Sequence, residues 1–560
     1  MARHGKKKYD RILQQAAFAA VVAVSILTSF WALGARRLGN HEAYVAIAAK
    51  EMASGGNWLI PYYNGEARLE KTPLNYWLVA AAAMAAGGIN DCIVRLPNAI
   101  LAALSVIAIF YFVSGRLGTR IAILSSLIWA TSLGYVRYSH TGRPEMSLTV
   151  FVAIAMMSFY SAINTYSRRE RIFYGLVFWI SFALAMLAKG PVPLLIIVPP
   201  IIIYLAVFRE WQKIKGTMPV VGLILFLLIV LPWPLMVAAK MHEIQKSSVS
   251  AQQQTAGPES TKGQGKTLAV WKKEFVDRFM GKYASGEKPG YYYLGVMFIF
   301  FLPFSAFVPA GLAAPFYPVW EKKRETMFYL WMWFTVGIVV MTLCGGKRQH
   351  YILPLMPAMA ILAGIIADDM IFVNKAYSKK FAMVFWVGHL FAIFCVAAGA
   401  IICMRSELYP LQFVTVSTAV VIVAVLFNVS VLFWLNKKVV AVMCLFAILC
   451  VSILIWPVLG YEQEDENYII CDFASRAAMV LGGREVVSYG RLDPAFVYYL
   501  GRNVPVIEDV NEIYKRYLND SGVITLKDNF EQLKNDERFK FRISSLDRDR
   551  GLFLKGREGE

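Results

Sequence analysis

The sequence predicts an all-α polytopic membrane protein of about thirteen transmembrane helices, followed by a small α/β domain at the C-terminus. Composition supports this fold class, because 58% of the 560 residues are hydrophobic and only 17% are charged. The mean hydropathy is +0.50. In addition, the apolar runs are long enough to cross the roughly 30 Å of hydrocarbon in a bilayer. These properties exclude an ordinary soluble protein.

The first apolar run, Leu13 to Leu33, follows the basic segment MARHGKKKYDR. Basic residues favour the cytoplasmic end of a span, which predicts a cytoplasmic N-terminus. The run is too long for the apolar part of a signal peptide and has no convincing cleavage site, so we expect a retained helix. Further spans are expected at residues 97–114, 121–137, 146–163, 172–188, 191–207, 217–238, 292–312, 327–344, 352–372, 380–402, 410–435 and 438–459.

Alternate connections between these spans carry the basic clusters, such as Arg168 to Arg171 and Lys322 to Arg324, which places them all on the cytoplasmic side. This register requires that the short apolar stretch from Leu74 to Ala86 does not cross the membrane. At about a dozen residues, that stretch is better interpreted as a helix lying in the membrane interface. The first external loop then runs from residue 35 to residue 96.

An odd number of spans sends the C-terminal residues to the outer face. We therefore divide the chain into a membrane domain at residues 1–459, with external loops at 35–96 and 240–290, and an external domain at 460–560. Segments such as EVVSYG and GVITLKD alternate with segments such as DPAFVYYLG and NEIYKRYL, which predicts an α/β fold. A polar tract within the loop at 240–290 is expected to be mobile.

The formal net charge of +19 comes from basic residues dispersed over the cytoplasmic loops rather than gathered on one face. Anionic membrane lipid is therefore the expected counterpart, and no nucleic-acid partner is predicted. The seven cysteines form no CxxC pair. Neither a disulfide framework nor a zinc site is predicted.

Polar residues crowd onto the external side of this topology. They occur in the first loop, in the turn HTGRPEM, at the end of the helix before Gly190, and in GGKRQHYILP. Carboxylates, cations and tyrosines thus reach one membrane face from separate parts of the chain. Individually, a helix terminus, an interfacial anchor or a solvated loop would explain each of them. Together, they indicate a site at the outer surface.

The chain resembles the GT-C class of membrane glycosyltransferases, in particular the bacterial aminoarabinose transferase and protein O-mannosyltransferase group. The resemblance lies in HEAYVAIAAKEMASGGNWLIPYYNGEARLEKTPLNYW, VRLPNAILAALSV, the RPE at Arg143 to Glu145, LAKGPVPLL and KRQHYILPLMPAMAILAG. The chain departs from the usual sequence of the family at two points. His41-Glu42 stands where the family usually has Asp-Glu, and Glu145 stands where the family usually has Asp.

The resemblance implies an inverting transfer of a sugar from a polyprenyl-phosphate-sugar donor to a glycolipid such as lipid A, a glycan or a protein hydroxyl in the envelope. Such a reaction needs a base for the acceptor hydroxyl and cations for the departing phosphate. Glu42 or His41 is the candidate base, and Glu145 and Glu70 are expected to orient the cations or the sugar. The candidate phosphate ligands are Lys71, Arg143, Lys189, Lys347, Arg348 and Tyr351.

The same resemblance implies a multi-pass protein of the bacterial inner membrane whose C-terminal domain is periplasmic. No cofactor and no required metal are predicted, because the long loop has Gly286-Glu287-Lys288-Pro289 where a histidine precedes the aromatic run in relatives. Two other functions fit a similar topology. One is a transporter or flippase of a lipid-linked sugar, and the other is a catalytically inactive scaffold for envelope assembly.

Overall fold

The computed structural model describes residues 2–252, 288–305, 307–373, 466–539, 543–547 and 550–554. The chain divides into two compact units. The membrane unit comprises Met1–Leu33, Leu69–Asn75 and Arg95–Gly460, and the terminal unit comprises Gly34–Arg68, Tyr76–Val94 and Tyr461–Glu560. This grouping differs from the division based on sequence, because most of the first loop packs with the C-terminal residues.

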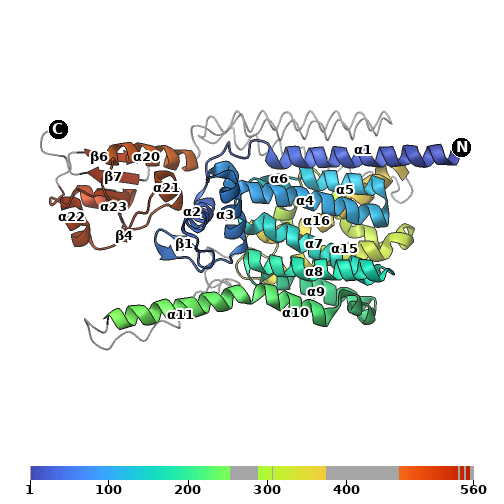
Figure 1. Cartoon of the computed structure of the whole chain (residues 1–560). Helices are drawn as coiled ribbons and strands as arrows, with labels where there is room; N and C mark the ends of the chain where they lie inside the picture. The colour runs from blue at the N-terminus through green and yellow to red at the C-terminus, as the bar shows by residue number, and fades with distance from the viewer. Residues whose placement is uncertain are drawn as a thin grey trace, which may run out of the picture. The chain divides into compact units, whose positions relative to one another are not determined.

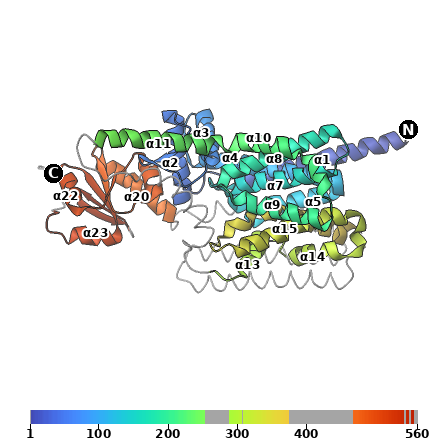
Figure 2. The same ribbon diagram turned by 90° about the horizontal axis from the view of Figure 1, so that it is seen from below.

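The membrane unit is a bundle of apolar helices. In Figures 1 and 2, α4 (Asp91–Leu117), α7 (Pro144–Asn164), α8 (Arg168–Lys189) and α15 (Arg324–Leu343) run in roughly the same direction, and α7 packs against α8. The remaining elements are α1 (Ala2–Phe30), α5 (Thr119–Thr131), α6 (Leu133–Ser139), α9 (Val192–Val207), η1 (Trp211–Thr217), α10 (Pro219–Val230), α11 (Pro232–Gln252), α13 (Tyr292–Phe300), α14 (Phe307–Ala313), η3 (Ala314–Phe316), η4 (Pro318–Lys323), η5 (Gln349–Leu355), α16 (Met356–Asp368) and the π-helical η6 (Asp369–Val373).

Within the described part of the chain, six helices are long and apolar enough to cross a membrane. The pair α5 and α6 would add a seventh span, bent by 58° at the break between them. The expected span at 292–312 is interrupted between α13 and α14 by a segment containing Pro303, whose ring cannot donate a backbone hydrogen bond. The spans expected at 380–402, 410–435 and 438–459, and most of the loop at 240–290, lie outside the described residues.

Helix α7, which carries the start of the site described below, lies in the interior of the membrane unit. Nearly all of its side chains from Glu145 to Ile163 are buried. Helices α5 and α16 also pack closely, since a Cβ atom at Gly364 would lie 2.1 Å from Ser125 Oγ. A residue without a side chain is therefore required at this crossing, which fixes α16 and the η5 turn before it against the bundle.

The terminal unit contains a five-stranded sheet in the order β4-β3-β5-β7-β6. Strands β4, β3 and β5 are parallel, and β7 and β6 are antiparallel. Strands and helices alternate along its sequence: α20 (Glu466–Leu481), β3 (Val486–Tyr489), α21 (Pro494–Leu500), β4 (Val506–Ile507), α22 (Val510–Leu518), β5 (Gly522–Leu526), α23 (Lys527–Lys534), β6 (Ile543–Asp547) and β7 (Arg550–Leu554).

Alternating residues of the strands build two apolar layers. Val486 and Ile524 face the layer that includes α20 and α21, whereas Val487 and Val523 face the layer that includes α22 and α23. This alternation follows from the two-residue repeat of a strand. Both faces of the sheet are therefore covered by helices.

The first loop contributes α2 (Asn40–Gly55), the hairpin β1 (Tyr62–Tyr63) with β2 (Glu66–Ala67), and α3 (Leu74–Ala86). Helix α3 has the bounds expected for the short apolar helix, which confirms that the helix exists. Ala43 of α2 is buried with Phe473 of α20 and Phe496 of α21. Such apolar burial, worth about 25 cal/mol per Å², explains why this loop groups with the C-terminal residues.

Candidate active site at the start of helix α7

The site centres on the start of α7. Arg143 precedes the helix, Pro144 is its first residue and Glu145 its second. Proline is favoured at the first helical position because it has no N–H to leave unsatisfied, and a carboxylate is favoured there by the helix dipole. The turn sequence therefore begins a helix and holds Glu145 at its positive end.

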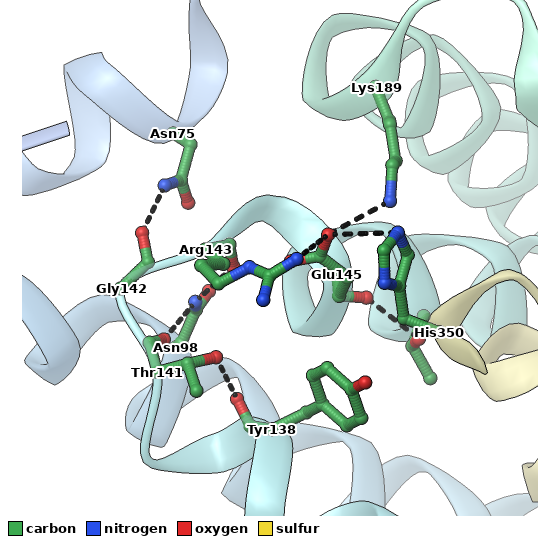
Figure 3. A network of polar contacts seen from close by, with 10 residues as sticks. Asn75, Asn98, Tyr138, Thr141, Gly142, Arg143, Glu145, Lys189 and His350 are labelled. Atoms are coloured by element: carbon green, nitrogen blue, oxygen red, sulfur yellow. Dashed lines mark hydrogen bonds and ion pairs between the residues drawn. The ribbon is translucent and has the colours of Figure 1, made fainter. Parts of the chain in front are cut away.

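Three basic side chains converge on one oxygen of Glu145 (Figure 3). Its Oε1 lies 3.2 Å from Arg143 Nη2, 3.1 Å from Lys189 Nζ and 3.4 Å from His350 Nε2. Lys189 is the last residue of α8, and His350 lies in η5. The cluster thus joins three separate segments of the membrane unit.

The cluster is buried. The exposed fraction of the side chain is 4% for Glu145, 10% for His350, 16% for Lys189 and 26% for Arg143. One carboxylate faces an arginine, a lysine and a histidine, so basic groups outnumber acidic groups in the cluster. A buried ion that is only partly compensated is costly. The arrangement is therefore suited to receiving an anion.

The second oxygen of Glu145, Oε2, is buried and has no hydrogen-bond partner within the described part of the chain. A buried carboxylate oxygen normally accepts at least one hydrogen bond.

Tyr351 lies beside the cluster. Lys189 Nζ is 5.4 Å from the centre of the Tyr351 ring, and the centres of the His350 and Tyr351 rings are 5.0 Å apart. Lys189 is thus enclosed by the cluster rather than exposed at a helix end.

Two buried asparagines hold the turn that carries Arg143. Asn98 Nδ2 donates to the carbonyl oxygens of Thr141 and Arg143, both at 2.6 Å, and Asn75 Nδ2 donates to Gly142 O at 2.7 Å (Figure 3). The Ser147 hydroxyl donates its proton to Asn98 Oδ1 at 2.7 Å, and its oxygen lies 3.3 Å from Asn75 Oδ1. Three successive carbonyls are therefore fixed by side chains, which leaves the turn little freedom.

We expect Asn98→Ala to destabilise the protein by about 1–3 kcal/mol or more, since each buried carbonyl left without a donor costs roughly that amount. The stability of the purified protein in detergent micelles should be measured by thermal or chemical unfolding. Leu104→Ala is a matched control, because Leu104 is an exposed residue of the same helix. Equal losses in the two variants would show that the amide network does not stabilise the turn.

Comparison with known proteins gives this geometry a context. A sequence model of the dolichyl-phosphate-mannose-protein mannosyltransferase family matches residues 70–235, which is less than a third of the chain. An uncharacterized protein of Aquifex aeolicus is 28% identical over 344 residues, 61% of this chain and 60% of that protein. The undecaprenyl phosphate-alpha-4-amino-4-deoxy-L-arabinose arabinosyl transferase of Pseudomonas aeruginosa is 24% identical over 335 residues, 58% of this chain and 56% of that protein. These matches span less than two thirds of either relative.

Solved structures match over nearly the whole chain. The crystal structure of ArnT from Cupriavidus metallidurans bound to undecaprenyl phosphate superposes with a TM-score of 0.77 at 18% identity, over 96% of this chain and 97% of that chain. The resemblance to the GT-C class is confirmed. The archaeal oligosaccharyltransferase AglB from Archaeoglobus fulgidus superposes more distantly, with a TM-score of 0.53 at 14% identity, over 95% of this chain and 72% of that chain. At these identities, the solved structures establish the GT-C fold alone.

Of the residues selected by their resemblance to GT-C motifs, the structure brings Arg143, Glu145, Lys189 and Tyr351 together. The other four phosphate-site or supporting candidates differ in burial. Lys71 and Lys347 are half-buried, and Glu70 and Arg348 are exposed. The backbone N–H of Arg348 donates to Tyr293 Oη at 3.3 Å. The roles of these four residues stay predictions.

The two candidate bases of the GT-C resemblance belong to the terminal unit. His41 is exposed, whereas Glu42 is buried and its Oε2 accepts a hydrogen bond from Gly39 N at 3.4 Å. Glu42 is the third residue of α2, where a carboxylate commonly caps the free N–H groups of a helix. Its side chain is therefore held in a defined position, and its catalytic role stays a prediction.

Sequence reasoning missed His350, Asn75 and Asn98. A signal existed for His350, because it lies between two selected residues in KRQHYILP. The only sequence signal for Asn75 and Asn98 is that they are polar residues within apolar runs.

The absence of a required metal stays a prediction. In the described ranges, no group of three or more His, Cys, Asp or Glu residues is placed to hold a metal ion.

Proposed function

We propose that this chain is an inverting glycosyltransferase that moves a sugar from a polyprenyl-phosphate-sugar donor to a hydroxyl group of an envelope acceptor. The observation that carries the proposal is the buried cluster at Glu145, in which Arg143, Lys189 and His350 share one carboxylate. Basic groups in a partly desolvated place stabilise a phosphate that gains charge as it leaves. Arginine and lysine are the usual ligands of phosphate oxygens.

The named activities of similar proteins favour the same donor class. The Pseudomonas aeruginosa relative is named for an undecaprenyl phosphate sugar, and the ArnT crystal structure contains undecaprenyl phosphate. A polyprenyl tail remains in the lipid while its head group is polar, so a site on a membrane protein suits this donor. The acceptor is either a glycolipid such as lipid A, another glycan, or a protein hydroxyl.

In the proposed reaction, the acceptor oxygen attacks the anomeric carbon while the bond from that carbon to the phosphate oxygen breaks. The proton of the acceptor hydroxyl passes to Glu42, and the electron pair of the broken bond remains on the polyprenyl phosphate. Arg143 and Lys189 neutralise the departing phosphate, and Glu145 holds both cations in place. A single displacement inverts the anomeric carbon. General-base catalysis of this kind typically contributes about 10²–10⁴ in rate.

A reconstituted assay tests the proposal. The purified protein in liposomes is supplied with radiolabelled undecaprenyl phosphate sugar and an envelope extract. A glycosyltransferase moves label to an acceptor, a flippase only moves the donor between leaflets, and a scaffold does neither. Label recovered on a lipid or protein acceptor supports the proposal, and either of the other two results overturns it.

We further propose that the protein lies in the bacterial inner membrane with a cytoplasmic N-terminus and a periplasmic C-terminal domain. The basic N-terminal segment and the distribution of lysine and arginine between the loops support this orientation. Alkaline phosphatase fused after Glu560 is expected to be active, since it folds only in the periplasm. Fluorescence from a reporter that folds only in the cytoplasm would contradict this orientation.

A further inference from the structure

We propose that the C-terminal segment, residues 466–554, holds the first loop and thereby positions the proposed base Glu42. The proposal rests on the proposed function, because it assigns a role in that reaction to a part of the chain that has none so far. The evidence lies entirely within the terminal unit. Side chains of the first loop and of the C-terminal segment bind each other's backbone at several points, although they are separated by more than 400 residues in sequence.

The hairpin between β1 and β2 is bound through Asn64. Its Nδ2 donates to Val504 O at 2.6 Å, and Val504 N donates to its Oδ1 at 2.6 Å. The side-chain amide thus pairs with both backbone groups of one residue, as a neighbouring strand would. Asn64 and Gly65 have φ angles of 56° and 83°, which asparagine and glycine adopt readily in a tight hairpin turn. This turn places the amide against Val504.

The start of α2 is bound through Asn40, directly before the two candidate bases. Asn40 Nδ2 donates to Asp493 Oδ1 at 3.3 Å, and Ala495 N donates to Asn40 Oδ1 at 3.2 Å. Asp493 flanks α21, but its own side chain does not cap that helix. Asn40 supplies the missing acceptor, so one side chain joins the beginnings of two helices.

The residues just before α2 are bound through Tyr499. Leu38 N donates to Tyr499 Oη at 2.6 Å, and the hydroxyl donates to Asp91 Oδ2 at 3.1 Å. Burial, followed by the charge of Asp91, raises the pKa of the Tyr499 hydroxyl, so the hydroxyl keeps its proton and can donate at neutral pH. Arg37 Nη1 also lies 3.5 Å from Asp91 Oδ2.

Apolar contacts secure the same region from the other side of the candidate bases. Ala43 is fully buried among residues of α20 and α21, including Phe473 and Phe496. Tyr498 and Tyr499 also pack against the buried apolar cluster that contains Val45 and Ala46 of α2. Residues on both sides of His41-Glu42 are therefore fixed by the C-terminal segment.

Such fixation matters because a general base must lie within about 2.6–3.2 Å of the proton that it takes. A misplacement of about 1 Å can cost roughly a hundredfold in rate. Asn40 and Asn64 are positioning residues in this scheme, since neither is assigned a contact with substrate. Their removal should lower kcat, leave the KM for the donor nearly unchanged, and leave the pH profile in place.

The full-length variants Asn40→Ala and Asn64→Ala test the proposal, with Asn519→Ala as the matched control. Asn519 is an exposed asparagine at the end of α22 in the same unit. Hydrogen exchange is measured over residues 37–67 without substrate, and kcat is measured per folded molecule. We expect faster exchange and a kcat lowered at least tenfold in both test variants, with the control unchanged. Asn64→Asp, which keeps the acceptor oxygen for Val504 N, should recover part of the loss.

The two readouts separate this proposal from the proposed function. If exchange over residues 37–67 stays at the level of the parent, the C-terminal segment does not hold the loop and the proposal is wrong. Faster exchange with an unchanged kcat also overturns it, because the loop would then need no positioning. A parent protein that transfers no sugar refutes the proposed function instead. In that case, hydrogen exchange still decides whether the C-terminal segment holds the loop.

Discussion

Glu145→Gln is expected to abolish sugar transfer and to lower the free energy of unfolding by about 3–5 kcal/mol, the range seen when one partner of a buried ion pair is removed. Glutamine keeps the shape of the side chain but not its charge. Lys189 and Arg143, both largely buried, would then face each other without a counterion. Unfolding in detergent measures the stability, and the transfer assay measures the activity.

Two further variants separate charge from shape. Glu145→Asp keeps the carboxylate and restores the residue usual in the GT-C family, so it should retain more stability and activity than the glutamine variant. The double variant Glu145→Gln with Lys189→Met removes the buried cation together with its partner. It should be more stable than Glu145→Gln alone, although it should remain inactive. A single glutamine variant as stable as the parent would show that Glu145 does not compensate these cations.

Glu42→Gln should reduce transfer by about 10²–10⁴-fold, the usual contribution of a general base, while donor binding remains close to that of the parent. Glutamine can still accept the hydrogen bond from Gly39 N that holds the side chain at the start of α2. The substitution therefore removes basicity with little change to the helix. Turnover and equilibrium binding of the donor should be measured on the same preparation.

His41 provides the control for this experiment, because it is the exposed neighbour of Glu42 on α2. His41→Ala should retain most activity, and His41→Asp, which restores the pair usual in the family, should be active. The opposite pattern, an active Glu42→Gln and an inactive His41→Ala, would assign the proton transfer to the histidine. Full activity in both would remove this part of the first loop from the chemistry.

The local features of the site could be predicted from the sequence. Arg143-Pro144-Glu145 marks a helix start, and Lys189-Gly190 marks a helix end. The convergence of these ends could not be predicted from the same signals. Lys189 and Glu145 lie 44 residues apart, and His350 comes from a third segment. Helical periodicity identifies the buried face of each helix but not which helix ends meet.

The helices, too, could be predicted only where a local property of the sequence determines them. Composition and run length predicted the apolar helices, and the bounds of α3 agree with the short apolar stretch from Leu74. The break between α13 and α14 was missed because the apolar run at 292–312 is long enough to be predicted as one span. The asparagines that hold the turn were missed for a different reason. Asn75 and Asn98 bind backbone carbonyls. Every residue has such a carbonyl, so a sequence pattern cannot reveal which one an asparagine will bind.

The pairing of Asn64 with Val504 also limits how this chain can be recombined with its relatives. The Asn64 side chain binds the backbone of the C-terminal segment. The packing around Ala43 depends on aromatic residues of that same segment. A chimera that exchanges only the C-terminal residues would present a foreign surface to the resident first loop. Exchange of residues 34–68 and 76–94 together with 461–560 would preserve both partners. The unit that a chimera must exchange intact in this part of the protein is therefore discontinuous in sequence.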